Sequence, residues 1–411
     1  MLAKLALQSL LDRKGSVMLS LMAMTVSIFV LLGVEHIRQQ TKENFSNTVS
    51  GVDLIVGART GSLNLLLYSV FRMGSPTNNI RMDTYDNIAS SPKVKWAIPL
   101  SLGDSHKGYR VLGTSSDYFR YFSYGKHHPL AFTQGQAFEQ LFDVVLGSNV
   151  AQKLGYTLGD KITLAHGIGA TSFSLHDDHP FTVTGILAAT GTPVDQTLHV
   201  RLEGIEAIHI DWQQGVKTHN SGLTQAELEQ AALQPKSITA IMLGLKSKMT
   251  TFQLQRTING YGQEPLTAIL PGVALSELWQ MMSLLENTLL LVSALVFLAA
   301  CLGVSAMLLA SIRERSREIQ LLRVIGAPPY ALFLLIELEA LLITLLSCVL
   351  AIVLLAACLS FLQDYLVSHF GLHILLNVFT ENSLYLIAAV ISASIVVAVI
   401  PSFSGYRKTK I

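Results

Sequence analysis

Four long apolar segments constrain this chain more than any other feature of its sequence. The hydrocarbon core of a bilayer is about 30 Å thick, and a helix needs about 20 apolar residues to cross it. Segments of this kind run from Ser16 to Val34, Thr288 to Ile312, Tyr330 to Leu362 and Asn382 to Ser402. The third contains two acids, and at 33 residues it must tilt, kink or extend beyond the bilayer. The sequence therefore predicts an integral membrane protein with four transmembrane helices.

Composition agrees with this class and argues against several others. Charged residues make up only 14% of the chain, against about 25% in an average soluble domain. The formal net charge is +1, and no basic stripe with interleaved aromatics is present, so we expect no nucleic-acid partner. Cys301, Cys348 and Cys358 all lie in apolar segments, where they are expected to act as small hydrophobic residues.

The distribution of lysine and arginine predicts the orientation. These residues occur in the N-terminal segment, in the loop between the second and third spans, and in the tail, whereas residues 363–381 contain none. Because short cytoplasmic loops are enriched in positive charge, both termini are expected in the cytoplasm and residues 35–273 outside. A cleaved signal peptide is the alternative for the first span, but Glu35 to Arg38 is not a small-residue cleavage site.

The first fifteen residues alternate leucines with polar side chains. Leu2, Leu5, Leu10 and Leu11 are interspersed with Lys4, Gln8, Asp12 and Arg13. This pattern is typical of a short amphipathic helix on the inner membrane surface, in contact with lipid. A frayed terminus is the alternative.

The large segment outside the membrane has alternating strand and helix signals, which predict an α+β domain. We expect strands at 52–56, 94–98, 161–164, 181–187 and 240–245, and helices at 63–71 and 224–233. The segment from Val144 to Gly155 predicts a strand, a turn and a helix that ends at Gly155. Thr224 and Glu227 have the spacing of a capping box.

A heptad-like seam leads from this domain into the second span. Leu275, Leu278, Met282 and Leu285 recur at intervals of three and four residues. An unbroken helix over 274–312 would be about 58 Å long at 1.5 Å per residue. Such a helix would project from the bilayer as a stalk.

Two motifs resemble a known family. The loop from Arg313 to Ala327, followed by Glu339 to Leu342, resembles the signature of FtsX-like permeases. The segment from Val144 to Leu164 is similar to part of the MacB-type periplasmic core domain. The chain thus resembles the MacB/LolC/FtsX-like ABC transporter permeases, also called type VII or mechanotransmission transporters. The resemblance implies an α-helical membrane protein with four transmembrane helices plus an α+β extracytoplasmic domain, in the bacterial inner membrane.

The resemblance also implies a role for the cytoplasmic loop. In the family, this loop forms a coupling helix that docks on a cytoplasmic ABC ATPase. The matching residues here are Arg313, Glu314, Arg315, Arg317, Glu318, Ile319, Leu322, Arg323 and Gly326. Pro328 and Pro329 depart from the family pattern and leave the geometry of the turn open. The alternative is a topogenic positive loop without a partner.

Glu339 matches the family glutamate at the start of the third span, and Glu337 is additional. Acids inside a membrane are costly and often functional. We expect a coupling or packing role for Glu339 rather than a role in substrate or proton transfer.

Ten of the twelve histidines lie between His36 and His219. His176 and His179 flank two aspartates, and imidazole with carboxylate suits Zn²⁺. A zinc site at His176 and His179 is therefore one hypothesis, and a polar loop of solvated histidines is the alternative.

These observations predict the following organisation: amphipathic helix 1–15; transmembrane helix 16–34; extracytoplasmic domain 35–273; stalk and second transmembrane helix 274–312; coupling loop 313–329; third transmembrane helix 330–362; short outer loop 363–381; fourth transmembrane helix 382–402; tail 403–411.

The expected function is that of a permease subunit. The sequence has no Walker A motif and none of the common hydrolase motifs, so we expect ATP to be hydrolysed by a separate ATPase subunit and the chain itself not to be an enzyme. Four spans also imply a dimer, with a second copy or a paralogue. An alternative is a signalling module that activates a periplasmic partner without moving cargo. A periplasmic or outer-membrane partner and the substrate both stay open.

Overall fold

The computed structural model describes residues 2–167, 179–210, 212–213, 216–217, 225–230, 233–314, 328–370 and 379–408. Its contacts divide the chain into two compact units. The helical unit comprises Met1–Thr41, Met282–Asp364 and Ile374–Ile411, and the α+β unit comprises Lys42–Met281 with Tyr365–His373.

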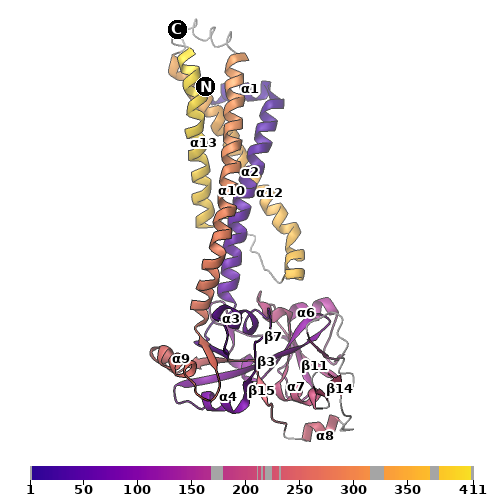
Figure 1. The fold of residues 1–411 in the computed structure, drawn as a ribbon. Helices are drawn as coiled ribbons and strands as arrows, with labels where there is room; N and C mark the ends of the chain where they lie inside the picture. The colour runs from indigo at the N-terminus through magenta and orange to yellow at the C-terminus, as the bar shows by residue number, and fades with distance from the viewer. Residues whose placement is uncertain are drawn as a thin grey trace. The chain divides into compact units, whose positions relative to one another are not determined.

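Among the described residues, five helices form the helical unit, which Figure 1 shows. They are α1 Leu2–Asp12, α2 Lys14–Asn47, α10 Pro271–Glu314, α12 Pro329–Phe370 and α13 Glu381–Lys408. Among the described residues, four of these helices are long and apolar enough to cross a membrane: α2, α10, α12 and α13. They confirm the four predicted transmembrane helices.

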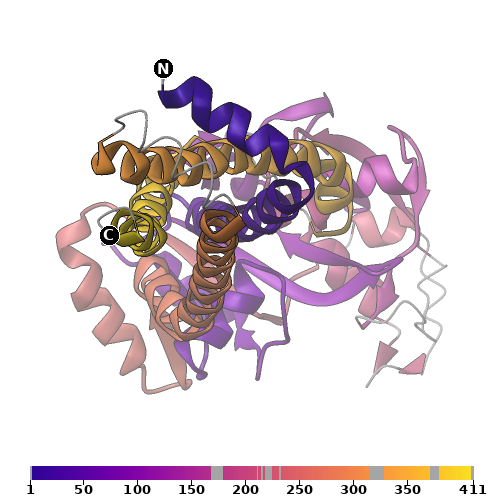
Figure 2. The ribbon, with the colours of Figure 1, turned by 90° about the horizontal axis from the view of Figure 1, so that it is seen from above.

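Two of these helices extend beyond the apolar segments that predict them. The helix α2 continues past Val34 to Asn47, and α10 runs as one helix from Pro271 to Glu314. The short helix α1 has a different direction: Figure 2 shows it lengthwise, while α10 and α13 are seen nearly end-on. Its location on the membrane surface stays a prediction.

Small hydroxyl side chains join the long helices inside the bundle. The Thr344 Oγ1 of α12 lies 2.5 Å from the Ser394 Oγ of α13, and both residues are buried. Ser347 donates to the backbone carbonyl of Leu21 in α2 at 3.4 Å. Such hydrogen bonds contribute modestly to helix association in lipid, typically by about 0.6–2 kcal/mol each.

One mixed sheet forms the centre of the α+β unit, with the order β17-β1-β16-β3-β4-β12-β8-β11-β7. These strands are Leu266–Ile269, Leu54–Ala58, Ala240–Leu245, Val94–His106, Tyr109–Thr114, Thr197–Arg201, Asp143–Leu146, Phe181–Leu187 and Phe132–Gly135. The short strands β10 (Ala165–His166) and β9 (Lys161–Ile162) pair with β3 and β11. Two pairs, β12 with β4 and β11 with β8, are parallel, and the others are antiparallel.

Short helices cover this sheet: α3 Ser62–Ser69, α4 Met82–Ala89, α5 Asp117–Tyr121, α6 Ser148–Leu154, α7 Leu202–His209, α8 Gln225–Gln230 and α9 Thr251–Asn259. Their apolar sides and the strands form three buried clusters, of which the largest contains Tyr118, Phe119 and Phe122. The α+β prediction is confirmed.

The strands at 181–187 and 240–245 have the predicted bounds. The strand expected at 52–56 begins two residues later, at Leu54, and the strand expected at 161–164 ends at Ile162. The helix expected at 224–233 spans Gln225–Gln230, and Thr224, the predicted capping residue, lies outside the described residues.

The segment from Val144 to Gly155 forms the predicted strand, turn and helix. The strand β8 ends at Leu146, Gly147 is the N-cap of α6, and Gly155 ends that helix in the left-handed conformation at φ 70°. Only a residue without a Cβ adopts this conformation at no steric cost.

Gly147 is required for another reason, because its φ of −66° is open to any residue. A Cβ built there would lie 2.3 Å from the carbonyl oxygen of Val194 and 2.5 Å from that of Asp195. Both contacts are with backbone, which cannot rotate away.

We therefore expect Gly147→Ala to destabilise the α+β unit by about 3 kcal/mol, since overpacking of this kind typically costs 1–3 kcal/mol or more. Gly61→Ala is the matched control, because Gly61 is the N-cap of α3 with nearly the same backbone angles and nothing within 4 Å of its Cβ position. The control should cost less than about 1 kcal/mol. Thermal unfolding of both variants compares the two sites, and equal losses would contradict this explanation.

Candidate functional site: two polar clusters in the membrane helices

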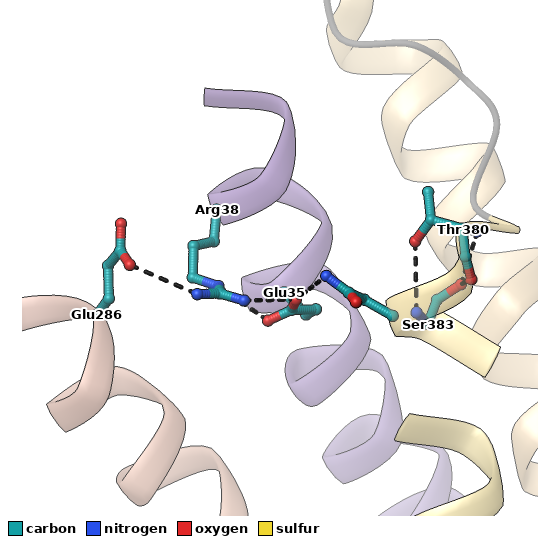
Figure 3. Close-up of polar contacts among 6 residues, drawn as sticks. Glu35, Arg38, Glu286, Thr380 and Ser383 are labelled. Carbon is teal, nitrogen blue, oxygen red and sulfur yellow. Dashed lines mark hydrogen bonds and ion pairs between the residues drawn. The ribbon is translucent and has the colours of Figure 1, made fainter. Parts of the chain in front are cut away.

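Arg38 is the centre of a polar cluster (Figure 3), near the end of the bundle that the sequence predicts to face outward. Its Nε and one terminal nitrogen donate to the two carboxylate oxygens of Glu35 on the same helix, at 2.9 and 2.7 Å. The other terminal nitrogen lies 3.6 Å from Glu286 Oε2 on α10. The Asn382 Nδ2 of α13 lies 3.4 Å from Glu35 Oε1. This outer cluster, Glu35, Arg38, Glu286 and Asn382, therefore links three helices.

Burial increases the contribution of the outer cluster to stability. Glu35 is only 5% exposed, while the side chains of Arg38 and Glu286 are 31% and 21% exposed. Two parallel hydrogen bonds from a guanidinium to a carboxylate are among the strongest polar contacts in proteins. Removing either partner would leave a partly buried charge without compensation.

The start of α13 is fixed by a reciprocal cap, also seen in Figure 3. The Thr380 amide donates to Ser383 Oγ at 2.9 Å, and the Ser383 amide donates to Thr380 Oγ1 at 3.3 Å. This arrangement satisfies two amides at the helix terminus. It also fixes the position of Asn382, which lies between the two capping residues.

A second cluster lies near the inner end and links α12 to the N-terminal helices. A terminal nitrogen of Arg13, between α1 and α2, lies 3.6 Å from Glu339 Oε2 on α12. The same nitrogen donates to Ser9 Oγ of α1 at 3.0 Å. Glu339 is 3% exposed, and the Arg13 side chain is 16% exposed. We call Ser9, Arg13 and Glu339 the inner cluster.

Glu337 is directed toward another helix. Among the described residues, neither carboxylate oxygen has a hydrogen-bond partner, although the Ser402 hydroxyl of α13 faces the carboxyl group. The two acids of α12 thus face different neighbours, Glu339 the α1–α2 junction and Glu337 helix α13.

The predicted coupling loop is only partly described. Arg313 and Glu314 form the end of α10, whereas Arg315, Arg317, Glu318, Ile319, Leu322, Arg323 and Gly326 lie outside the described residues. The next described helix, α12, begins at Pro329. Glu339 follows ten residues later, about 15 Å along the helix axis. The inner cluster is thus connected to the loop by less than three turns of one helix.

Of the two predicted zinc ligands, only one lies within the described residues. His176 lies outside the described residues, and the ring of His179 stacks on Phe142 with centroids 5.5 Å apart. Within the described part of the chain, no group of three or more His, Cys, Asp or Glu residues could hold a metal ion. Zinc binding stays a hypothesis, which titration of the protein with Zn²⁺ would test.

Sequence reasoning missed most of both clusters. From the sequence, Glu35 and Arg38 were considered only as residues that follow the first span, and Arg13 only as a charge that sets the orientation. Glu286 and Asn382 had no predicted role. The one sequence feature that could have indicated these residues is their position, because each lies within five residues of the end of an apolar segment. Only Glu339 was predicted, and its ion partner was not.

An α+β unit between the first and second of four membrane-crossing helices defines a polytopic membrane protein with one large outer domain. Residues 17–261 match the MacB-like periplasmic core domain, and residues 290–410 match the FtsX-like permease C-terminal domain. The chain therefore belongs to the MacB/FtsX-like family of ABC transporter permeases. It is an inner-membrane protein, in a family that implies an ABC ATPase partner and oligomerisation.

Two solved structures are similar to this chain. One is the periplasmic region of MacB from Actinobacillus actinomycetemcomitans, with 11% identity, a TM-score of 0.35, and coverage of 56% of this chain and 94% of that one. The other is the extracellular domain of the noncanonic ABC-type transporter YknZ from Gram-positive bacteria, with 11% identity, a TM-score of 0.31, and coverage of 53% and 99%. No curated protein matches the chain.

Proposed function

We propose that this chain is the permease subunit of an ATP-driven transporter that transmits motion from a cytoplasmic ATPase to the outer domain. The proposed topology places both termini and the coupling loop in the cytoplasm and the α+β unit in the periplasm. A separate subunit hydrolyses ATP, and a second copy or a paralogue completes the permease dimer.

The observation that carries this proposal is the continuity of α10. This helix begins at Pro271, directly after the last strand of the α+β unit, and ends at Glu314, in the first residues of the coupling loop. Its 44 residues correspond to about 66 Å of unbroken helix. The chain thus runs from the last strand of the α+β unit to the coupling loop without a break in this helix.

The inner cluster provides a second connection in this proposal. A movement of the coupling loop would displace the start of α12, and Glu339 would carry that displacement to Arg13 and the start of α2. The outer cluster then keeps α2, α10 and α13 together. The helices α2 and α10 would thus move together.

In this proposal the substrate is extruded from the periplasm or outer leaflet, and a metal-linked substrate is part of the hypothesis because of the histidine-rich outer domain. A signalling module is the second candidate function. It is favoured if a periplasmic protein that binds the outer domain is activated by ATP without transport.

A pull-down of the tagged protein in mild detergent tests the proposal. We expect an ABC ATPase to co-purify with the wild type and to be lost from the variant Glu318→Arg/Arg323→Glu. Arg256→Glu is the control, because Arg256 is exposed on α9, far along the chain from the loop, and should leave the complex intact. Absence of an ATPase from the wild type even after crosslinking would contradict the proposal.

A further inference from the structure

Arg72 is a buried cation with no carboxylate partner among the described residues. It follows α3 at a φ of 58°, and the residue is only 9% exposed. One terminal nitrogen donates to the backbone carbonyl of Ser69, and the other lies 3.5 Å from the Tyr118 hydroxyl. Its Nε has no hydrogen-bond partner among the described residues. No described carboxylate lies within 4.0 Å of the guanidinium.

His199 lies beside this arginine and is also unsatisfied. It is fully buried in β12, and within the described part of the chain neither ring nitrogen has a hydrogen-bond partner. Burial, and then the charge of Arg72, lower the pKa of His199 to about 3, so the imidazole is neutral and carries one N–H donor. The carbonyl of Val145, its neighbour on β8, faces the ring without hydrogen-bond geometry.

Tyr118 completes the group and contributes a donor. Its ring centroid lies 5.2 Å from that of His199, and its side chain is fully buried. Because the hydroxyl oxygen accepts from Arg72, its own proton is available for another acceptor. Phe119 meets His199 nearly edge-on at 5.9 Å, and aromatic edges carry partial positive charge.

A second arginine near Arg72 adds to the uncompensated positive charge. Arg110 on β4 is close enough for Arg72 to lower its pKa together with burial, and its guanidinium donates to the backbone carbonyl of Gly74 at 2.6 Å. Among the described residues, both arginines therefore donate hydrogen bonds to neutral oxygen atoms and to no carboxylate. A buried charge without a counter-ion costs several kcal/mol, and a water molecule would satisfy the donors but not the charge.

We propose that Arg72, Tyr118 and His199 form a binding site for a small monovalent anion of the halide class in the core of the α+β unit. Among the described residues, Arg72 Nε and the ring nitrogens of His199 have no hydrogen-bond partner, the Tyr118 hydroxyl has a proton to donate, and the set has a net positive charge. All three are at least nine-tenths buried, so the site would exclude phosphate or a carboxylate, for which the core would have to open, and admit only a small anion. The anion would neutralise Arg72 and fix the loop after α3 against the sheet.

Thermal unfolding of the full-length protein in detergent tests the site, with sodium chloride compared with sodium gluconate at equal ionic strength. Gluconate is too large to enter the core. We expect the melting temperature of the α+β unit to rise by roughly 3–6 °C in chloride at about ten times its dissociation constant, with saturation, and bromide to replace chloride.

Variants and diffraction separate this site from general salt effects. Arg72→Met should abolish the chloride dependence, and Tyr118→Phe should weaken the apparent affinity about tenfold by removing one donor. Arg120→Met, at an exposed arginine beside Tyr121, should retain the wild-type response.

If Arg72→Met fails to fold, Tyr118→Phe and the anomalous signal of bromide in crystals of the wild type decide the question. Equal melting temperatures in chloride and gluconate, or no bromide peak between Arg72 and His199, would overturn the proposal. None of these outcomes depends on the ATPase, so the proposed function can fail independently.

Discussion

Replacement of Glu35 by alanine is expected to lower the free energy of unfolding of the helical unit by about 2–3 kcal/mol. The variant removes both hydrogen bonds to Arg38 and leaves a guanidinium that is only 31% exposed without its main partner. Breaking a buried ion pair typically costs 3–5 kcal/mol, and the partial exposure of Arg38 reduces that figure here. Denaturant titration of the purified protein in detergent measures the loss.

A matched control is available on α13. Glu381 is exposed in the first turn of that helix, and Glu381→Ala should change stability by less than about 1 kcal/mol. The double variant Glu35→Ala/Arg38→Ala should recover part of the loss, because the guanidinium of Arg38 is no longer left without Glu35, although Glu286 loses its contact 3.6 Å away. If Glu35→Ala costs no more than Glu381→Ala, the outer cluster does not hold the helices together.

The membrane helices could be predicted from the sequence because their signal is local. About 20 consecutive apolar residues suffice to identify a span, whatever the rest of the chain does. The strand, turn and helix at Val144 to Gly155 could also be predicted, since Gly147 and Gly155 mark the two ends of α6. The strand β1 was predicted to begin two residues early because apolar Val52 stands before it with only Asp53 between, while pairing with β16 begins at Leu54.

The polar clusters could not be predicted because they depend on contacts between distant segments. Glu35 and Asn382 are 347 residues apart in the chain, and Arg13 precedes the first span whereas Glu339 lies in the third. Each of these residues is ordinary for the end of a membrane helix, where charged side chains mark the interface. Only the packing of the helices brings them together.

The same limit applies to the core of the α+β unit. Ten histidines in one segment suggested a metal, yet the described histidines include His199, a neutral imidazole beside a buried arginine. Burial and neighbouring charge, rather than residue type, decide what such a histidine binds. Neither can be inferred from spacing along the chain.

Exchange of Arg13 or Glu339 for glutamine should separate ATPase binding from coupling. Both residues lie outside the proposed docking loop, so the variants should still co-purify with the ATPase. The rate of ATP hydrolysis by the purified complex should nevertheless fall about tenfold, since coupling energies between sites are typically 1–3 kcal/mol. Lys14→Gln is the control, because Lys14 is the next cation along the chain, is exposed, and has no ion pair with a described residue.

A charge exchange distinguishes a direct contact from a general loss of structure. Arg13→Glu/Glu339→Arg reverses the pair and should restore at least part of the hydrolysis that either single charge reversal removes, since the two side chains lie 3.6 Å apart. If the glutamine variants hydrolyse ATP at the wild-type rate, the inner cluster is a packing contact and transmits nothing. If the charge exchange is no better than the single reversals, Glu339 acts through another neighbour, and the path from the coupling loop to α2 must run through α12 and Ser347 instead.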